Sequence, residues 1–478
     1  MKKYHSVIGL KKAVLVALEK GEINSSLSLI SDFVEFIVSE PLCIAQVFAS
    51  KTLDDLCLYI GKKSLADVMA LRTDASIEAD GSRCFVYIVT KLQKSGGHTR
   101  VIEEFIAARP DEKHIILSTE LAGKSDSNYL RDGLGRHVSI SFERAPKVEG
   151  QRRLAWLQRR LLELQPTKTY LFNRDHDSIA VAAIQPEMKL DASFYHHSDY
   201  HLCLGVHLSH LEHIDFHPVG YHNCRAELGV DNIYIPLSAD DKGMRPSHWL
   251  FAQGGEITTC TAGRYNKIEV PYFISYLDMV PQILQATKGR HVHIGLLSPW
   301  ALIKIRRGLK RRGIAKERFI YTPWVPSVWR ALHDYRVDLY IVSFPYGGGL
   351  TLVEVMGAGV PVAMHRHIYY KLLNCVDMAY AGAFSWSSPS ELLDYCSSLT
   401  PWQLESESKL SRLQYEQHHT TGGLRAVLDG KVVDAPPCSR DFSVQIDEWG
   451  LWMARRVTLT AVLSKVIYRL AKRFKRLF

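Results

Sequence analysis

The sequence predicts an α/β protein with two doubly wound parallel-sheet domains, a helical region before them and an amphipathic helix after them. Three observations support this prediction. Strand-like and helix-like runs alternate from residue 84, a second round of alternation begins near residue 257, and glycine-rich turns follow strands in both rounds. Doubly wound sheets bind ligands at the carboxyl ends of their strands, so we expect the two domains to face each other across a cleft.

Residues 1–80 are expected to form short amphipathic helices. The run "LSLISDFVEFIVSE" has the helical spacing of apolar residues, and "DASIEADGSR" is typical of a linker. The opening run resembles a signal peptide only briefly, because its apolar core is short and ends in "EKGE". Nine scattered cysteines without a CxxC pair indicate a reducing compartment, so we expect a cytoplasmic protein.

The first parallel-sheet domain is expected at residues 81–237. Its strands are predicted in "CFVYIVT", "HIILST", "TYLFN", "DASFYHH" and "NIYIPL". The loop "KSGGH" separates the first strand from the helix "TRVIEEFIAAR" and contains Gly96 and Gly97. This loop is not GxGxxG, so it does not predict a dinucleotide site.

The second parallel-sheet domain is expected at residues 238–430. Its strands are predicted in "ITTCTA", "HVHIGLL", "RFIYTPWV", "DLYIVSF" and "PVAMH", with helices near 272–287 and 299–312. The chain has 478 residues and 46% hydrophobic content, which suits two large cores better than one.

The tail, residues 431–478, carries most of the formal net positive charge. Eight basic and no acidic residues lie between Arg455 and Phe478, which leaves +1 of the formal net charge of +9 for the rest of the chain. Apolar residues recur there at helical spacing, so we expect a basic amphipathic helix on an anionic membrane surface. A helix packed on the protein is the alternative. Nucleic acid binding is not expected, because no aromatic stacking platform accompanies the cations.

The glycine-rich segment "SFPYGGGLTLVEVMGAGVPVA" at 343–363 is the strongest functional signal. Glycines at the end of a strand let backbone N–H groups and a helix N-terminus face an anion. Glu354, about one turn into that helix, can accept hydrogen bonds from sugar hydroxyls. Phosphate together with ribose indicates a nucleotide, whereas tight packing of a helix on the sheet is the alternative interpretation.

At these residues the sequence resembles glycosyltransferases of the GT-B fold, which have two Rossmann-like domains. The resemblance is to bacterial polysaccharide enzymes like those of glycosyltransferase family four, and more distantly to enzymes of the O-GlcNAc-transferase type. Retaining members often have an E-x7-E pair, but Tyr346 stands eight residues before Glu354. The resemblance implies that the segment binds the donor through Gly347, Gly348, Gly349, Leu350, Thr351 and Glu354.

Two further segments are similar to donor-binding elements of this family. "TAGRYNK" places Arg264 and Lys267 after the first strand of the second domain, where two cations would neutralise a diphosphate leaving group. The spacing between them is shorter than usual in the family. "YTPWVP" places Trp324 and Val325 where the resemblance implies contact with the nucleobase, although packing of Trp324 in the core is equally compatible with the sequence.

Histidines of the first domain are the candidates for acid/base chemistry. His98 follows the glycine pair Gly96 and Gly97, and "YHHSDYHLCLG" looks like an "HHxDH" stretch of the same enzymes. We predict that His197 with Asp199, or His98, removes the acceptor proton, since this step needs a group with a pKa near 7. A metal site at His197 and His201 is the alternative, but no HExxH accompanies them, so no metal is predicted.

The sequence therefore predicts a metal-independent, hexosyltransferase-type enzyme that moves a sugar from a nucleotide sugar to a hydroxyl group. A UDP-sugar is the expected co-substrate, and no other cofactor is expected. The expected acceptor is a lipid-linked or polysaccharide glycan, as in lipopolysaccharide or capsule synthesis at the inner face of a bacterial membrane, with other glycan-assembly proteins as partners. A cytoplasmic protein glycosyltransferase and a non-catalytic sugar-nucleotide-binding scaffold are the alternatives.

Overall fold

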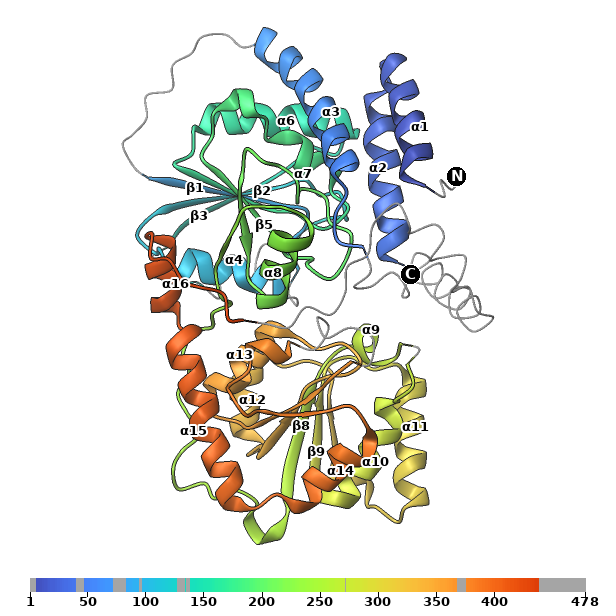
Figure 1. The fold of residues 1–478 in the computed structure, drawn as a ribbon, viewed down its shortest axis with the longest axis vertical. Coiled ribbons are helices and arrows are strands. Elements are labelled where there is room, and N and C mark those ends of the chain that lie inside the picture. The colour runs from blue at the N-terminus through green and yellow to red at the C-terminus, as the bar shows by residue number, and fades with distance from the viewer. Residues whose placement is uncertain are drawn as a thin grey trace. The chain divides into compact units, whose positions relative to one another are not determined.

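A computed structural model describes residues 6–39, 47–71, 83–93, 97–126, 134, 138–270, 272–367 and 375–437. These residues divide into an N-terminal domain up to Ile235 and a C-terminal domain from Pro236 on, with His217–Val219 grouped with the second (Figure 1). Gly96 and the predicted tail helix at 455–478 lie outside the described residues. Within the described ranges, no helix is both long enough and apolar enough to cross a membrane.

The N-terminal domain contains a seven-stranded parallel sheet in the order β3-β2-β1-β4-β5-β6-β7. Tyr87 of β1 pairs with Ile116 of β2 on one side and with Tyr170 of β4 on the other. The strand order reverses between β1 and β4, which is where doubly wound sheets bind ligands. The strands are β1 (Cys84–Val89), β2 (Lys113–Ser118), β3 (Ser139–Arg144), β4 (Lys168–Phe172), β5 (Ala192–Tyr195), β6 (Glu212–Asp215) and β7 (Asn232–Tyr234).

Helices cover both faces of this sheet (Figure 1). Side chains alternate between the faces along each strand. On one face, Phe105 of α4 packs edge-on against Tyr170, Phe172 and Tyr195. On the other face, Leu171 and its neighbours join a core with α6 and α7. The helices of the domain are α1 (Val7–Glu19), α2 (Ile23–Val38), α3 (Lys51–Ala70), α4 (Gly97–Ala107), α6 (Gly150–Leu164), α7 (Ser178–Ala183) and α8 (Pro218–Glu227).

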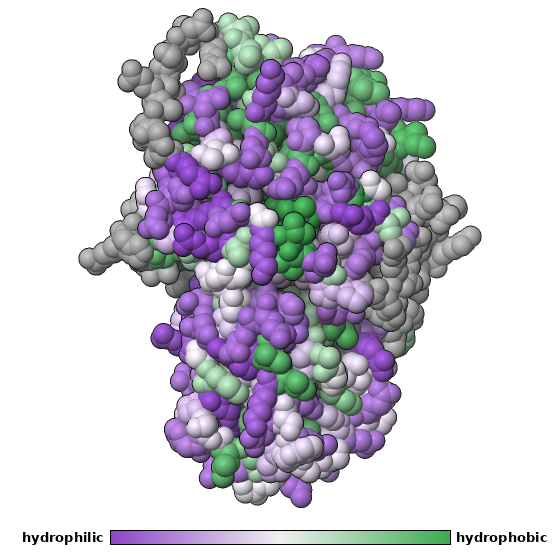
Figure 2. Space-filling view, turned by 60° about the vertical axis from the view of Figure 1, so that its left-hand side comes forward, coloured by the Kyte–Doolittle hydropathy of each residue, from purple (hydrophilic) through white to green (hydrophobic). Residues whose placement is uncertain are grey.

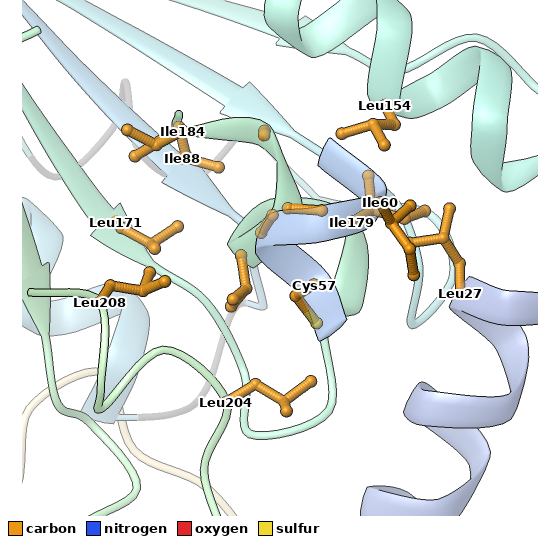
Figure 3. Packing of buried hydrophobic residues seen from close by; sticks show 14 of the residues in the cluster. Leu27, Cys57, Ile60, Ile88, Leu154, Leu171, Ile179, Ile184, Leu204 and Leu208 are labelled. Atoms are coloured by element: carbon orange, nitrogen blue, oxygen red, sulfur yellow. The ribbon is translucent and has the colours of Figure 1, made fainter. Parts of the chain in front are cut away.

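The predicted helical region before the first strand packs into this same core. Leu27 of α2 and Ile60 of α3 lie among residues of β1, β4, α6 and α7 (Figure 3). A side chain at Gly61 would overlap the Ala182 carbonyl, so α3 and α7 approach closely. Asp54 of α3 accepts hydrogen bonds from the backbone N–H groups of Gly205 (2.7 Å) and His207 (2.9 Å). The first helices therefore support the histidine-rich segment.

The C-terminal domain repeats the plan with six parallel strands in the order β10-β9-β8-β11-β12-β13. Its order reverses between β8 and β11. The strands are β8 (Ile257–Ala262), β9 (Lys288–Ile294), β10 (Phe319–Thr322), β11 (Leu339–Ile341), β12 (Val362–His365) and β13 (Phe384–Trp386). The predicted pair of doubly wound domains is confirmed.

Helices α10, α11 and α14 lie on one side of this sheet and α12, α13 and α15 on the other (Figure 1). Hydrophilic residues cover most of the molecular face in Figure 2, with hydrophobic residues in small groups, as expected when apolar residues fill interior cores. The helices of the domain are α9 (Tyr265–Ile268), α10 (Tyr276–Thr287), α11 (Pro299–Arg311), α12 (Val328–Asp334), α13 (Gly349–Gly357), α14 (Pro389–Ser398), α15 (Pro401–His418) and α16 (Thr421–Leu428).

Candidate functional site

Two of the predicted segments meet at the strand-order reversal of the C-terminal sheet. The segment with Arg264 and Lys267 follows β8, and the glycine loop follows the adjacent strand β11. The Lys267 ammonium donates a hydrogen bond to the Gly347 carbonyl at 2.6 Å, and the Tyr346 N–H lies 3.4 Å from the Lys267 carbonyl. Segments about 80 residues apart in the chain thus form one surface at the carboxyl edge of the sheet.

This surface has positive charge that no carboxylate among the described residues pairs with. Burial lowers the pKa of Lys267, with the neighbouring Cys375 acting in the opposite direction. Neither Lys267 nor the exposed Arg264 forms an ion pair with any described residue. A desolvated ammonium without a counterion favours an anionic ligand, because the ligand's charge offsets the cost of desolvation.

The N-terminus of α13 adds partial positive charge at the same place. Gly348 is its N-cap and offers no side chain to the first N–H groups, while Leu350 and Thr351 occupy the half-buried first turn. A Cβ on Gly348 would lie 3.1 Å from the Lys267 ammonium nitrogen, tighter than an ordinary contact. The uncapped first turn of a nine-residue helix and a cation beside it form an anion-binding arrangement.

Not every glycine of the segment serves that surface. A Cβ on Gly357 would overlap the indole ring of Trp329, so this glycine permits close packing of α13 on α12. A Cβ on Gly349 would lie 3.0 Å from Leu237 Cδ1. The packing interpretation therefore explains Gly357 and part of the need for Gly349, while Gly347 and Gly348 form the contact with Lys267.

Trp324 and Val325 follow β10 at the carboxyl edge of the same sheet. The Trp324 side chain is 50% exposed, whereas Val325 is half-buried. The alternative that Trp324 fills the core is therefore wrong. Its exposed indole can stack on a flat ring. Glu354, five residues after the start of α13, is half-buried.

In the N-terminal domain, two candidate histidines lie against each other. His98 is the second residue of α4, which follows β1, and His197 stands two residues after the end of β5. Their rings are stacked, with centroids 4.4 Å apart and planes inclined by 19°. Segments separated by about a hundred residues thus present two imidazoles at the carboxyl edge of the first sheet.

The surroundings of His98 keep its ring neutral. Burial, then the charges of His197 and Arg174, hold the pKa of His98 well below its ordinary value, and a hydrogen bond with the Phe172 backbone offsets only part of this effect. Its Nε2 is buried and has no hydrogen-bond partner among the described residues. A neutral imidazole with an available nitrogen can accept a proton at neutral pH.

Asp199 does not complete an acid/base pair with His197, because no hydrogen bond joins these two described residues. Its carboxyl group packs against α8, where a Cβ on Gly220 would lie 2.8 Å from Asp199 Oδ2. Burial and the nearby charge of Asp215 raise the pKa of Asp199 well above its ordinary value. The structure therefore separates Asp199 from the stacked histidines.

His197 and His201 do not form the metal pair that the sequence left as an alternative. Burial lowers the pKa of His201 to about 4. Among the described residues, the one group with metal-binding geometry is His196, His213, Asp215 and Cys224. No motif in the sequence predicts this group, although Asp215 and Cys224 both lie close to the histidine-rich run.

Comparison with known proteins identifies the architecture. No family model and no curated protein matches the sequence. Among solved structures, HepE of Anabaena in complex with UDP and glucose is similar, with a TM-score of 0.55 at 12% identity over 72% of this chain and 98% of HepE. A glycosyltransferase from Rickettsia africae has a TM-score of 0.53 at 11% identity over 73% of this chain and 97% of its own.

The chain has the GT-B fold. This confirms the fold that the glycine loop and the alternating pattern predicted. The matches extend over nearly the whole length of both solved structures, so the two doubly wound domains of this chain correspond to a complete GT-B pair. At 11–12% identity the likeness concerns the fold, and the function is argued from the residues themselves.

Proposed function

We propose that this protein is a glycosyltransferase that moves a sugar from a nucleoside diphosphate sugar to a hydroxyl acceptor. One observation carries the proposal: the half-buried Lys267, without an anionic partner among the described residues, lies against the glycine loop beside the uncapped N-terminus of α13. HepE, which shares the fold, was solved with UDP and with UDP-glucose. This supports UDP-sugar as the donor class.

In the donor half of the reaction, the bond between the anomeric carbon and the diphosphate oxygen breaks, and its electron pair stays on the diphosphate. Lys267, Arg264 and the N–H groups of α13 stabilise the charge that develops there. Glu354 accepts hydrogen bonds from the ribose hydroxyls, and Trp324 stacks on the base.

In the acceptor half, the acceptor oxygen forms the new bond to the anomeric carbon. Its proton passes to an imidazole nitrogen of the stacked pair, His98 or His197. The pKa of His98 is held low, so this ring is neutral at pH 7, and it is a weaker base than the group with a pKa near 7 that the sequence predicted. Asp199 has no part in the step.

Replacing Glu354 with glutamine distinguishes the proposed enzyme from the alternative, a non-catalytic sugar-nucleotide-binding scaffold. Loss of a charged acceptor of hydrogen bonds costs about 1.5–3 kcal/mol, so kcat/KM for the donor should fall about 10- to 150-fold. The measurement is release of UDP from UDP-sugars, including slow hydrolysis without acceptor. Exposed Glu405 on α15 is the matched control, and Glu405→Gln should change nothing. If wild-type protein releases no nucleotide from any donor, the scaffold is the better account.

We also propose that the acceptor is a lipid-linked or polysaccharide glycan and that the protein works at an anionic membrane surface. The sequence of the tail supports this location, and so does α11. Trp300 (62% exposed) and Ile303 (42% exposed) lie on the solvent face of α11. The same face carries four exposed cations that have no ion-pair partner among the described residues: Arg306, Arg307, Lys310 and Arg311. An exposed Trp beside clustered cations suits an anionic bilayer surface.

Reversing two of these charges should weaken binding to vesicles of anionic phospholipid. Each cation near such a surface contributes about 1 kcal/mol, so Arg307→Glu with Lys310→Glu should reduce the affinity about 30-fold or more. The measurement is co-sedimentation with anionic and with neutral vesicles. The matched control reverses exposed Lys11 and Lys12 of α1. Equal binding of all three proteins would refute a role for α11.

A further inference from the structure

Four side chains of metal-binding types meet inside the N-terminal domain. His196 directly follows β5, His213 and Asp215 belong to β6, and Cys224 lies on α8. Their ligand atoms all lie within 4.8 Å of one another, and all four residues are buried. The proposed sugar transfer uses none of them.

The ligand atoms lie about as close together as those around a small tetrahedral ion. Cys224 Sγ lies 3.4 Å from His196 Nδ1 and 3.7 Å from Asp215 Oδ1. His196 Nδ1 lies 3.0 Å from Asp215 Oδ1, and His213 Nε2 lies 3.2 Å from Asp215 Oδ2. Bonds of about 2.0–2.3 Å to tetrahedral zinc place neighbouring ligands about 3.3–3.8 Å apart. The two distances from Cys224 Sγ lie in this range, and the two distances between imidazole and carboxylate lie just below it, so a bound ion would widen them slightly.

The contacts around these side chains hold two of them in place. His213 Nδ1 donates a hydrogen bond to the Val206 carbonyl at 3.3 Å. Asp215 Oδ2 accepts a hydrogen bond from Asn232 at 2.6 Å. His213 Nε2 lies 3.2 Å from the same carboxylate oxygen and has no hydrogen bond of acceptable geometry among the described residues. These contacts direct the second nitrogen of His213 toward the middle of the group.

The kind of ligand indicates which ion. One thiolate, two imidazoles and one carboxylate form a mixed set that suits zinc, and four protein ligands without exposure to water are typical of a structural site. The hydrogen bonds from His213 to Val206 and from Asn232 to Asp215 fix the ring and the carboxylate, as the outer contacts of metal ligands do.

We propose that His196, His213, Asp215 and Cys224 bind one structural zinc ion. Coordination needs the thiolate, so binding releases the proton of Cys224 to solvent. The ion joins the end of β5, the strand β6 and α8, and it holds the residue next to His197 in the chain. It thereby fixes the segment that carries one of the two stacked histidines. This site replaces the expectation from sequence that the chain binds no metal, and it is independent of the proposed sugar transfer.

Metal analysis of the full-length protein, purified without chelators, tests this site. We expect about one zinc per chain in the wild type. Cys224→Ser should lose the zinc. Cys203→Ser should retain it, because Cys203 is equally buried in the same domain but does not belong to the group of four ligands. Cobalt added in place of zinc should give thiolate-to-cobalt absorption in the wild type and in Cys203→Ser, but not in Cys224→Ser.

A second measurement uses the wild type alone, in case Cys224→Ser does not fold. Treatment with a strong chelator should lower the Tm, and added Zn²⁺ should restore it whereas Mg²⁺ should not. Wild-type protein with no zinc above buffer level and no response of Tm to Zn²⁺ would overturn the proposal. Full zinc content in a folded Cys224→Ser protein would overturn it as well.

Discussion

Replacing Lys267 with methionine should lower kcat for sugar transfer about 100-fold or more, the cost of removing one preorganised electrostatic contact to a developing anion. Methionine keeps the apolar stem that packs beside the glycine loop and removes the ammonium that contacts the Gly347 carbonyl. Affinity for UDP should fall in parallel, because the ammonium also binds the diphosphate in the ground state. Initial rates and equilibrium binding of UDP measure the two effects.

The matched control is Lys316→Met. Lys316 is an exposed residue of the short 3-10 helix before β10, and its ammonium lies 3.9 Å from Glu317 Oε1. This variant should keep wild-type kinetics. Thermal unfolding checks that both proteins are folded. A folded Lys267→Met protein with unchanged kcat and unchanged UDP affinity would remove this residue from the site.

Replacing either of the stacked histidines should have the second largest effect. One variant should lose turnover, and the other should change the pH dependence of the reaction. Loss of a general base costs about 100- to 10,000-fold in rate. If His98 is the base, His98→Phe loses turnover at every pH. His197→Phe keeps the stacked ring but removes a charge that lowers the pKa of His98.

The direction of the pH change follows from that contact. A base works in its neutral form, so a pKa held below the ordinary value keeps the enzyme active as the pH falls. Without the His197 charge, the pKa of His98 rises toward its ordinary value. The acid limb of kcat/KM against pH should then move to higher pH in His197→Phe. The reverse pattern assigns the base to His197, and full activity in both variants would refute a role for the pair.

The sequence was sufficient for the two doubly wound domains, although it predicted no strand at β3, β6 or β13. It also located the candidate donor segment. Alternating apolar runs predicted both sheets because parallel strands buried on both faces are continuous apolar runs. The glycine loop and "GR…K" were found separately, and the hydrogen bond between Lys267 and the Gly347 carbonyl now joins them. That contact depends on β8 and β11 being neighbours in the sheet, which strand order determines and local pattern does not.

The histidine-rich segment shows where local reasoning failed. Asp199 is two residues from His197, yet a turn after β5 directs its carboxyl group toward Gly220 instead. The contact of His197 with His98 joins β1 and β5, which are separated in the sheet by β4. The grouping of Cys224 with His196 likewise depends on how α8 packs. Contacts of this kind come from tertiary packing and leave no periodic signal in the sequence.

Thermal unfolding in the presence of UDP, GDP, CDP, dTDP, ADP and CMP tests the central claim most directly. A ligand at about 100 times its Kd adds roughly 2.7 kcal/mol to the stability of the folded state. We predict that UDP raises the Tm of the wild type and that Arg264→Ala and Lys267→Met reduce or abolish the shift. If none of these nucleotides raises the Tm of the wild type, the glycine loop binds no nucleotide and the account of the donor site is wrong.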